Sequence, residues 1–157
     1  MAKPLIMVVE DEVSYAEAVS SLLKNSGRYD AVIANSAKDA FETLKKNKRM
    51  FGVLSNKIRC ILLDIKMPEM DGLQFLEKLR KEHPEKIAVI MVTAYEDAEK
   101  WDKATDGRVA GYIKKPYKGE ELLGKLDRLF SDQFAQEEMI ADTDIESFDK
   151  VKGKNKE

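Results

Sequence analysis

The chain of 157 residues has one cysteine, one histidine and no apolar run long enough to cross a bilayer. A single cysteine excludes an internal disulfide and cannot by itself supply a thiolate metal site. The apolar neighbours of Cys60 favour a buried core thiol over a nucleophile. Because His83 is the only histidine, histidine-rich metal sites are excluded as well.

The sequence also lacks a strong charge of one sign. Its 27 basic and 29 acidic side chains give a formal net charge of −2, which is too close to zero to indicate a nucleic-acid or membrane surface. The N-terminus has Lys3 and Pro4 but neither the apolar segment nor the small-residue cleavage site of a signal peptide. We therefore expect a cytoplasmic protein that binds neither nucleic acid nor membrane.

Five short apolar runs alternate with helical patterns along the chain. The runs that we expect to form strands are residues 5–9, 31–34, 60–64, 87–92 and 109–113. Strands that are apolar on both faces and alternate with helices are typical of a parallel sheet covered on both sides. With right-handed crossovers, the pattern predicts a doubly wound α/β three-layer sandwich. The helix expected around residues 97–105 is the weakest, with Trp101 as its only large apolar residue.

Polar residues stand where these strands end. Glu10 and Asp11 follow the first strand, Asp64 ends the third, Thr93 follows the fourth and Lys115 follows the fifth. Because the carboxyl ends of parallel strands open on one edge of a sheet, we expect these side chains to meet. Three converging carboxylates resist ionisation unless a cation intervenes, and Mg²⁺ is the preferred hard cation for oxygen ligands. A lysine and a hydroxyl in the same pocket suit a phosphoryl group.

Other interpretations of these residues are weaker. Taken singly, each is an ordinary turn acid, helix cap or surface charge, but together they require four coincidences at one sheet edge. Hydrolases that form an aspartyl phosphate have a second aspartate two residues after the nucleophile, where this chain has Lys66. A nucleotide-binding domain would need a glycine-rich first turn, which Val9–Val13 does not provide.

Four segments together resemble the receiver domains of two-component response regulators over roughly residues 4–130. They are Val8–Glu12, Leu62–Gly72, Val92–Ala94 and Gly111–Pro116. The resemblance implies a flavodoxin-like (βα)5 fold with strand order 2-1-3-4-5, an order that comes from the family and not from the pattern of this chain. It also implies a sensor histidine kinase as the partner that phosphorylates Asp64.

The resemblance further assigns metal ligands and a phosphoryl-binding group. Asp11 and Asp64 would bind Mg²⁺ directly, together with the backbone carbonyl of Lys66, while Glu10 would act through a bound water. Lys115 would pair with the phosphoryl oxygens, and its peptide bond to the next proline would be cis. Such a chain assists only its own phosphorylation and dephosphorylation and is not an enzyme in the ordinary sense.

The expected signal depends on Thr93 and Tyr112. By the same resemblance, Thr93 would move to hydrogen-bond the phosphoryl group, and Tyr112 would turn into the space left behind, so that phosphorylation biases two packings. The alternative is a degenerate receiver that serves as a docking module without phosphorylation. Lys66 and Tyr95 are expected to lie over the pocket mouth, where Lys66 could either obstruct the attacking water or polarise the phosphoryl group.

Residues 131–157 fit no part of this sheet scheme. The spacing of Leu126, Phe130 and Phe134 predicts that the last helix continues to about residue 138. An exposed Phe134 would favour a phosphorylation-dependent homodimer or contact with a downstream protein. The charged remainder, from Ala141, has few apolar residues to bury and is expected to be a disordered tail or linker.

Overall fold

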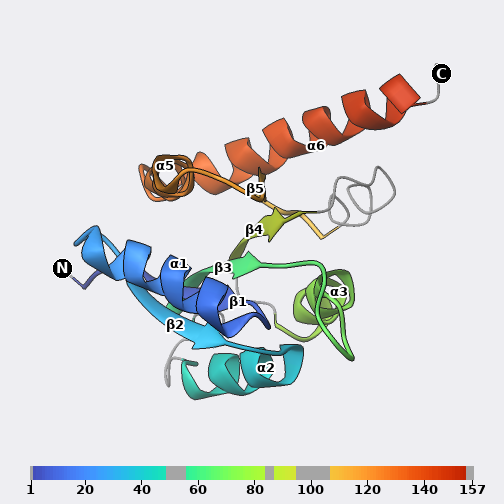
Figure 1. Ribbon diagram of the computed structural model, residues 1–157. Coiled ribbons are helices and arrows are strands. Elements are labelled where there is room, and N and C mark those ends of the chain that lie inside the picture. The colour runs from blue at the N-terminus through green and yellow to red at the C-terminus, as the bar shows by residue number, and fades with distance from the viewer. Residues whose placement is uncertain (1, 49–55, 84–86, 95–106, 155–157) are drawn as a thin grey trace.

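The computed structural model of the chain describes residues 2–48, 56–83, 87–94 and 107–154. Within these ranges five parallel strands form one sheet in the order β2-β1-β3-β4-β5. This confirms the predicted doubly wound α/β fold and the strand order implied by the family (Figure 1). The strands are β1 (Leu5–Val9), β2 (Asp30–Ala34), β3 (Ile58–Leu63), β4 (Ala88–Thr93) and β5 (Gly111–Lys114).

β1 has the predicted bounds, and the ends of the other strands lie within two residues of the predicted ones. β3 begins at Ile58, two residues earlier than predicted, because Ile58 pairs with Leu5 across a register shift in the ladder between β1 and β3. β3 also ends at Leu63, so that Asp64 is the first residue after the strand. β5 begins at Gly111 and not at residue 109, because its pairing with β4 starts between Gly111 and Ile90.

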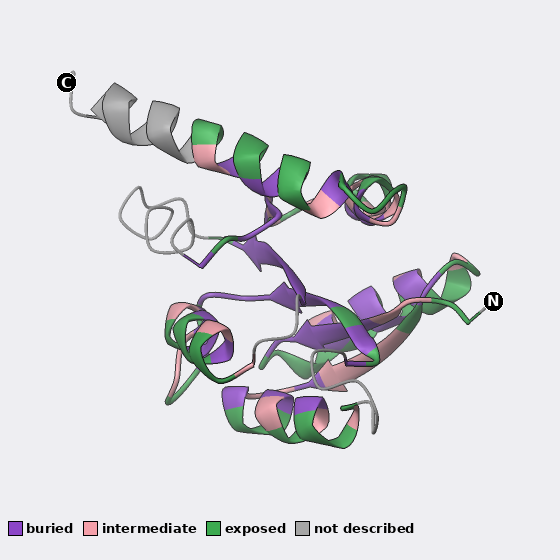
Figure 2. Ribbon diagram, turned by 180° about the vertical axis from the view of Figure 1, so that it is seen from behind, coloured by how far each residue is buried: buried purple, intermediate pink, exposed green. Residues whose placement is uncertain are grey.

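Helices cover both faces of the sheet. They are α1 (Val13–Asn25), α2 (Ala37–Lys46), α3 (Gly72–Glu82), α5 (Gly119–Leu129) and α6 (Ala135–Lys154). Successive strand residues point to opposite faces, so Met7 packs in one apolar cluster with α2 and α3, while Val8 packs in the other with α1 and α5. Figure 2 shows the central strands of the resulting sheet as mostly buried, whereas the edge strand β2 is mostly of intermediate burial. None of the described helices has the length and apolar composition needed to cross a membrane.

The weak helix expected around residues 97–105, with Trp101, and the expected position of Tyr95 both concern residues 95–106. These expectations lie outside the described residues.

The C-terminal segment is where the structure contradicts the sequence-based expectation. The last sheet-covering helix, α5, does not continue to residue 138: it ends at Leu129, and a separate helix, α6, begins at Ala135. Local hydrogen bonds cause the break, because the Ser131 hydroxyl donates to the carbonyl of Arg128 at 2.6 Å and the Asp132 carboxylate accepts from the backbone N–H of Phe134 at 2.7 Å.

The predicted disorder after residue 141 is also wrong for the described part of that segment. α6 runs to Lys154 and its first half packs on α5 and β5, beyond the β5 edge of the sheet (Figure 1). Met139 and Ile140 are 2% and 4% exposed and join the apolar cluster under α5. Ion pairs from Arg108 to Glu137 and from Arg128 to Asp142 hold the same half of the helix.

Candidate functional site

The polar residues at the ends of the strands surround one cavity. Glu10 and Asp11 follow β1, Asp64 follows β3, Thr93 is the last residue of β4 and Lys115 follows β5. The cavity measures about 230 Å³, several times the volume that a water molecule occupies in the liquid. Its described lining residues are Glu10, Asp11, Glu12, Asp64, Lys66, Thr93, Ala94 and Lys115.

Lys115 bridges two buried carboxylates. Its Nζ lies 2.8 Å from Oε1 of Glu10 and 3.1 Å from Oδ2 of Asp64. Glu10 and Asp64 are only 4% and 9% exposed, so both interactions are largely shielded from water. The peptide bond between Lys115 and Pro116 is cis, as the resemblance implied. The ammonium therefore sits beside the acid that we expect to be phosphorylated.

Burial and charge shift the pKa values in this cavity. Burial, followed by the hydrogen bond and the negative charge of Asp64, raises the pKa of Glu10 to about 8 despite the opposing effect of Lys115. Burial lowers the pKa of Lys115, but the hydrogen bonds and charges of Glu10 and Asp64 outweigh it and raise that pKa above its ordinary value. The single ammonium of Lys115 therefore does not offset the burial of Glu10 and the neighbouring negative charge of Asp64, and the cavity can accommodate further positive charge.

The donor set fits a divalent cation. Glu10, Asp11 and Asp64 each offer a carboxylate oxygen, and these oxygens lie within 4.8 Å of one another. Oε2 of Glu10 is buried and has no hydrogen-bond partner among the described residues, which is costly unless a cation or water satisfies it. Three carboxylate oxygens are the ligands that Mg²⁺ prefers.

The turn after β3 fixes Asp64 through backbone contacts. The N–H of Asp64 donates to the carbonyl of Val9 at 3.2 Å, and the N–H of Lys66 donates to Oδ1 of Asp64 at 3.3 Å. The N–H of Gly72, the first residue of α3, donates to the carbonyl of Ile65 at 2.8 Å. The sequence pattern explains Gly72 only as turn chemistry, but the start of α3 lies directly against the backbone that carries Asp64.

Thr93 and Tyr112, the two residues expected to transmit the signal, have different surroundings. Thr93 is 1% exposed and lines the cavity, and its carbonyl accepts from the N–H of Lys115 at 2.9 Å. Tyr112 pairs with Met91 in the β4–β5 ladder, is half-buried and packs against the apolar cluster on the α3 side of the sheet. Burial raises the pKa of Tyr112. Tyr112 is not among the described residues that line the cavity.

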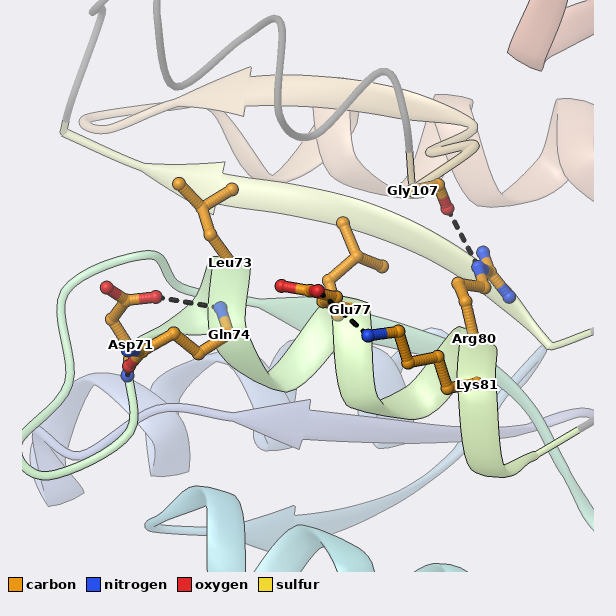
Figure 3. Close-up of a pocket in the computed structure, with 8 residues that line it drawn as sticks. Asp71, Leu73, Gln74, Glu77, Arg80, Lys81 and Gly107 are labelled. Atoms are coloured by element: carbon orange, nitrogen blue, oxygen red, sulfur yellow. Dashed lines mark hydrogen bonds and ion pairs between the residues drawn. The ribbon is translucent and has the colours of Figure 1, made fainter.

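A larger cavity, of about 530 Å³, lies beside α3 (Figure 3), and none of Glu10, Asp11 and Asp64 is among its described lining residues. The polar groups around it are engaged with one another: Asp71 with Gln74, and Glu77 with Lys81. Arg80 donates to the backbone carbonyl of Gly107 at 2.7 Å. The chemistry expected from the sequence therefore belongs to the smaller cavity at the strand ends.

Comparison with known proteins agrees with this geometry. The family model described as the response regulator receiver domain matches residues 6–127. The chain is 28% identical over 127 residues to the transcriptional regulatory protein CrdR of Helicobacter pylori, covering 81% of this chain and 55% of the relative. It is 30% identical over 150 residues to the hybrid signal transduction histidine kinase D of Dictyostelium discoideum, covering 92% of this chain and 9% of the relative.

A similar fold occurs among solved structures. A response regulator receiver protein from Pseudomonas putida superimposes with a TM-score of 0.72 at 27% identity, covering 81% of this chain and 98% of the other. The chain thus spans about half the length of CrdR and a small part of the hybrid kinase, but nearly the whole of this solved receiver protein. The chain therefore belongs to the response regulator receiver domain family of two-component signalling systems.

Proposed function

We propose that Asp64 accepts a phosphoryl group from a histidine kinase and that the modified domain signals through Thr93 and Tyr112. One observation carries the proposal. Lys115 lies within hydrogen-bonding distance of both Glu10 and Asp64, and Asp11 completes a group of three carboxylates around the same cavity. This arrangement combines a nucleophile, a phosphoryl-binding cation and a set of metal ligands.

The proposed chemistry uses Asp64 as the nucleophile. A carboxylate oxygen of Asp64 attacks the phosphorus of the phosphohistidine, so that an O–P bond forms and the P–N bond breaks. The electron pair of that bond leaves with the imidazole, which takes up a proton. Lys115 moves with its ammonium toward the phosphoryl oxygens and stabilises their negative charge. The domain assists only this transfer and the later hydrolysis, in keeping with receiver domains as signalling modules.

The chain's own oxygens would hold the metal ion. Asp11, Asp64 and the backbone carbonyl of Lys66 are the expected direct ligands of Mg²⁺, with Glu10 acting through a bound water. When bound, Mg²⁺ supplies positive charge that offsets both the carboxylates and the incoming phosphoryl oxygens. The buried and unpartnered Oε2 of Glu10 supports this assignment, because it requires a cation or a water.

The proposed switch couples the phosphoryl group to the β5 side of the sheet. Thr93 and Lys115 are joined through their backbones at 2.9 Å, so a shift of Thr93 toward the phosphoryl group would disturb the end of β5 as well. Tyr112 lies on that strand and has an aromatic ring that could turn inward once Thr93 has moved. Phosphorylation would then favour one of two packings, and that packing would form a phosphorylation-dependent homodimer or bind a downstream protein.

Intact-mass spectrometry tests the phosphoryl transfer. With acetyl phosphate or a phosphorylated histidine kinase and Mg²⁺, the protein should gain the mass of one phosphoryl group. Asp64→Asn should gain none, and Asp11→Ala or excess chelator should reduce the gain strongly. Glu12→Gln is a matched control, because Glu12 lines the same cavity but lies outside the three-carboxylate group.

Full incorporation in Asp64→Asn would refute the assignment of the phosphorylated residue. Failure of the unmodified protein to incorporate phosphoryl from either donor would refute the function itself. It would identify the chain instead as a docking module that works without phosphorylation.

A further inference from the structure

Besides the carboxylates of Glu10 and Asp64, the ammonium of Lys115 has an aromatic ring as a neighbour. Tyr15 lies near the start of α1, and its ring centroid is 4.1 Å from Nζ of Lys115. The negative face of an aromatic ring attracts an ammonium ion at this distance, and more strongly where water is partly excluded. The Lys115 side chain is only 16% exposed, so this attraction is weakly screened. The sequence pattern places Tyr15 only on the inward face of a helix.

A second aromatic ring holds Tyr15 in place. Tyr117, two residues after Lys115, meets Tyr15 edge to face with ring centroids 6.2 Å apart and an interplanar angle of 80°. Both rings pack against the apolar cluster beneath α1 and α5. Burial raises the pKa of Tyr15, so its hydroxyl stays protonated and its ring neutral. The two rings therefore connect α1 to the loop that carries Lys115.

The chemistry of the site explains why a ring is useful there. Glu10 and Asp64 hold the ammonium in the present arrangement, but both are also expected to serve a metal ion, and Asp64 is expected to be phosphorylated. A carboxylate in the place of Tyr15 would compete for the ammonium and for the metal. The ring attracts Lys115 without offering a metal ligand, so the attraction persists when the two carboxylates are engaged elsewhere.

We propose that Tyr15 is a positioning residue that holds the ammonium of Lys115 beside Asp64 during phosphoryl transfer. The proposal rests on the function proposed above. It assigns the ring, and not the hydroxyl, as the active part of Tyr15. Phenylalanine at this position should therefore preserve the effect, whereas leucine fills part of the space without a charged ring face and should not.

The first test compares phosphorylation rates with acetyl phosphate and Mg²⁺. Tyr15→Leu should slow incorporation about five- to tenfold, while Tyr15→Phe should stay close to the unmodified protein. Leu22→Ala is the matched control, because Leu22 is a half-buried residue of the same helix and the same apolar cluster. Equal slowing in Tyr15→Leu and Leu22→Ala would overturn the proposal, as it would reflect helix packing. Equal slowing in Tyr15→Phe and Tyr15→Leu would overturn it as well.

The second test needs neither metal nor phosphoryl donor. In the Mg²⁺-free protein, the NMR signal of the Lys115 methylene next to the ammonium should be shifted upfield by the ring current of Tyr15. Lys115→Arg identifies that signal by its absence. The shift should persist in Tyr15→Phe and disappear in Tyr15→Leu, and the same position in all three proteins would overturn the proposal. If the unmodified protein takes up no phosphoryl group, the proposed function fails, but this comparison still decides whether Tyr15 holds Lys115.

Discussion

Gly72 should be intolerant of even one added carbon atom. A Cβ at this position would lie 2.1 Å from the backbone oxygen of Asp64 and 2.8 Å from the Cα of Ile65. Both obstacles are backbone atoms, so neither can swing aside as the end of a flexible side chain could. The N–H of Gly72 also donates to the carbonyl of Ile65 at 2.8 Å, which ties the two segments together.

The size of the effect follows from these distances. Real Cβ atoms do not approach closer than 3.0 Å, so the start of α3 and the turn after β3 would have to separate by about 1 Å. Overpacking of this kind costs about 1–3 kcal/mol, and weakening the hydrogen bond to Ile65 adds about 1 kcal/mol. We therefore expect Gly72→Ala to lower the free energy of unfolding by about 2–4 kcal/mol. Because Asp64 would be displaced too, phosphorylation should slow by up to about 100-fold.

Urea denaturation and intact-mass spectrometry measure the two effects. Gly124→Ala is the matched control: Gly124 is exposed in α5, and a Cβ there would meet nothing within 4 Å. That substitution should stabilise the protein by about 0.5–1 kcal/mol, because alanine is the better helix former, and should leave phosphorylation unchanged. The reasoning is refuted if Gly72→Ala unfolds at the same urea concentration as the unmodified protein and is phosphorylated at the same rate.

Three further outcomes are expected. Lys66→Ala should shorten the lifetime of the aspartyl phosphate, because the exposed Lys66 lines the cavity through which water must reach Asp64. The lifetime is followed as loss of the phosphoryl mass, and an unchanged decay rate would contradict this expectation. Arg80→Met should lower the free energy of unfolding, measured in urea, by roughly 3 kcal/mol, since three backbone carbonyls lose their charged donor. Substitution of the exposed Lys81 by methionine should have little effect, and equal urea midpoints for the two variants would contradict this expectation. Removal of residues 139–157 should lower the free energy of unfolding by about 3–5 kcal/mol, because the two buried apolar side chains of α6, Met139 and Ile140, are lost. Met139→Ala should reproduce about half of that loss, whereas substitution of the 61%-exposed Ile145 by alanine should not, and a truncated protein as stable as the full chain would contradict this expectation.

The sheet and the cavity at its edge could be predicted because both depend on short-range patterns. A run such as Ile87–Val92 is apolar without interruption, and such runs separated by helical patterns leave few alternatives to a parallel sheet. Once the strands are parallel, their carboxyl ends share one edge. The proximity of Glu10, Asp64 and Lys115 then follows from topology alone.

Helix α6 could not be predicted in the same way. Its apolar residues lie on two sides: Met139 and Ile140 are buried against α5 and β5, whereas Phe134, just before the helix, and Ile145 are 62% and 61% exposed. A helix without one apolar face gives a weak periodic signal, and the many acids of this segment resemble a disordered composition. What orders its first half is the surface beneath it, which is formed by elements earlier in the chain.

The residues that act in the site and those that support it differ in how visible they are in a sequence. A carboxylate or an ammonium at the end of a buried apolar strand is energetically unfavourable there, so the sequence alone indicates a function for Asp64 and Lys115. Gly72 and Tyr15 give no such indication, because a glycine in a turn and a tyrosine on a helix are both common for structural reasons alone. Their roles depend on two distances between different segments of the chain: 2.1 Å from a Cβ added at Gly72 to the Asp64 oxygen, and 4.1 Å from the Tyr15 ring to the Lys115 ammonium. The groups that carry out the chemistry can therefore be inferred from residue type and position, whereas the residues that position those groups can be inferred only from contacts in the structure.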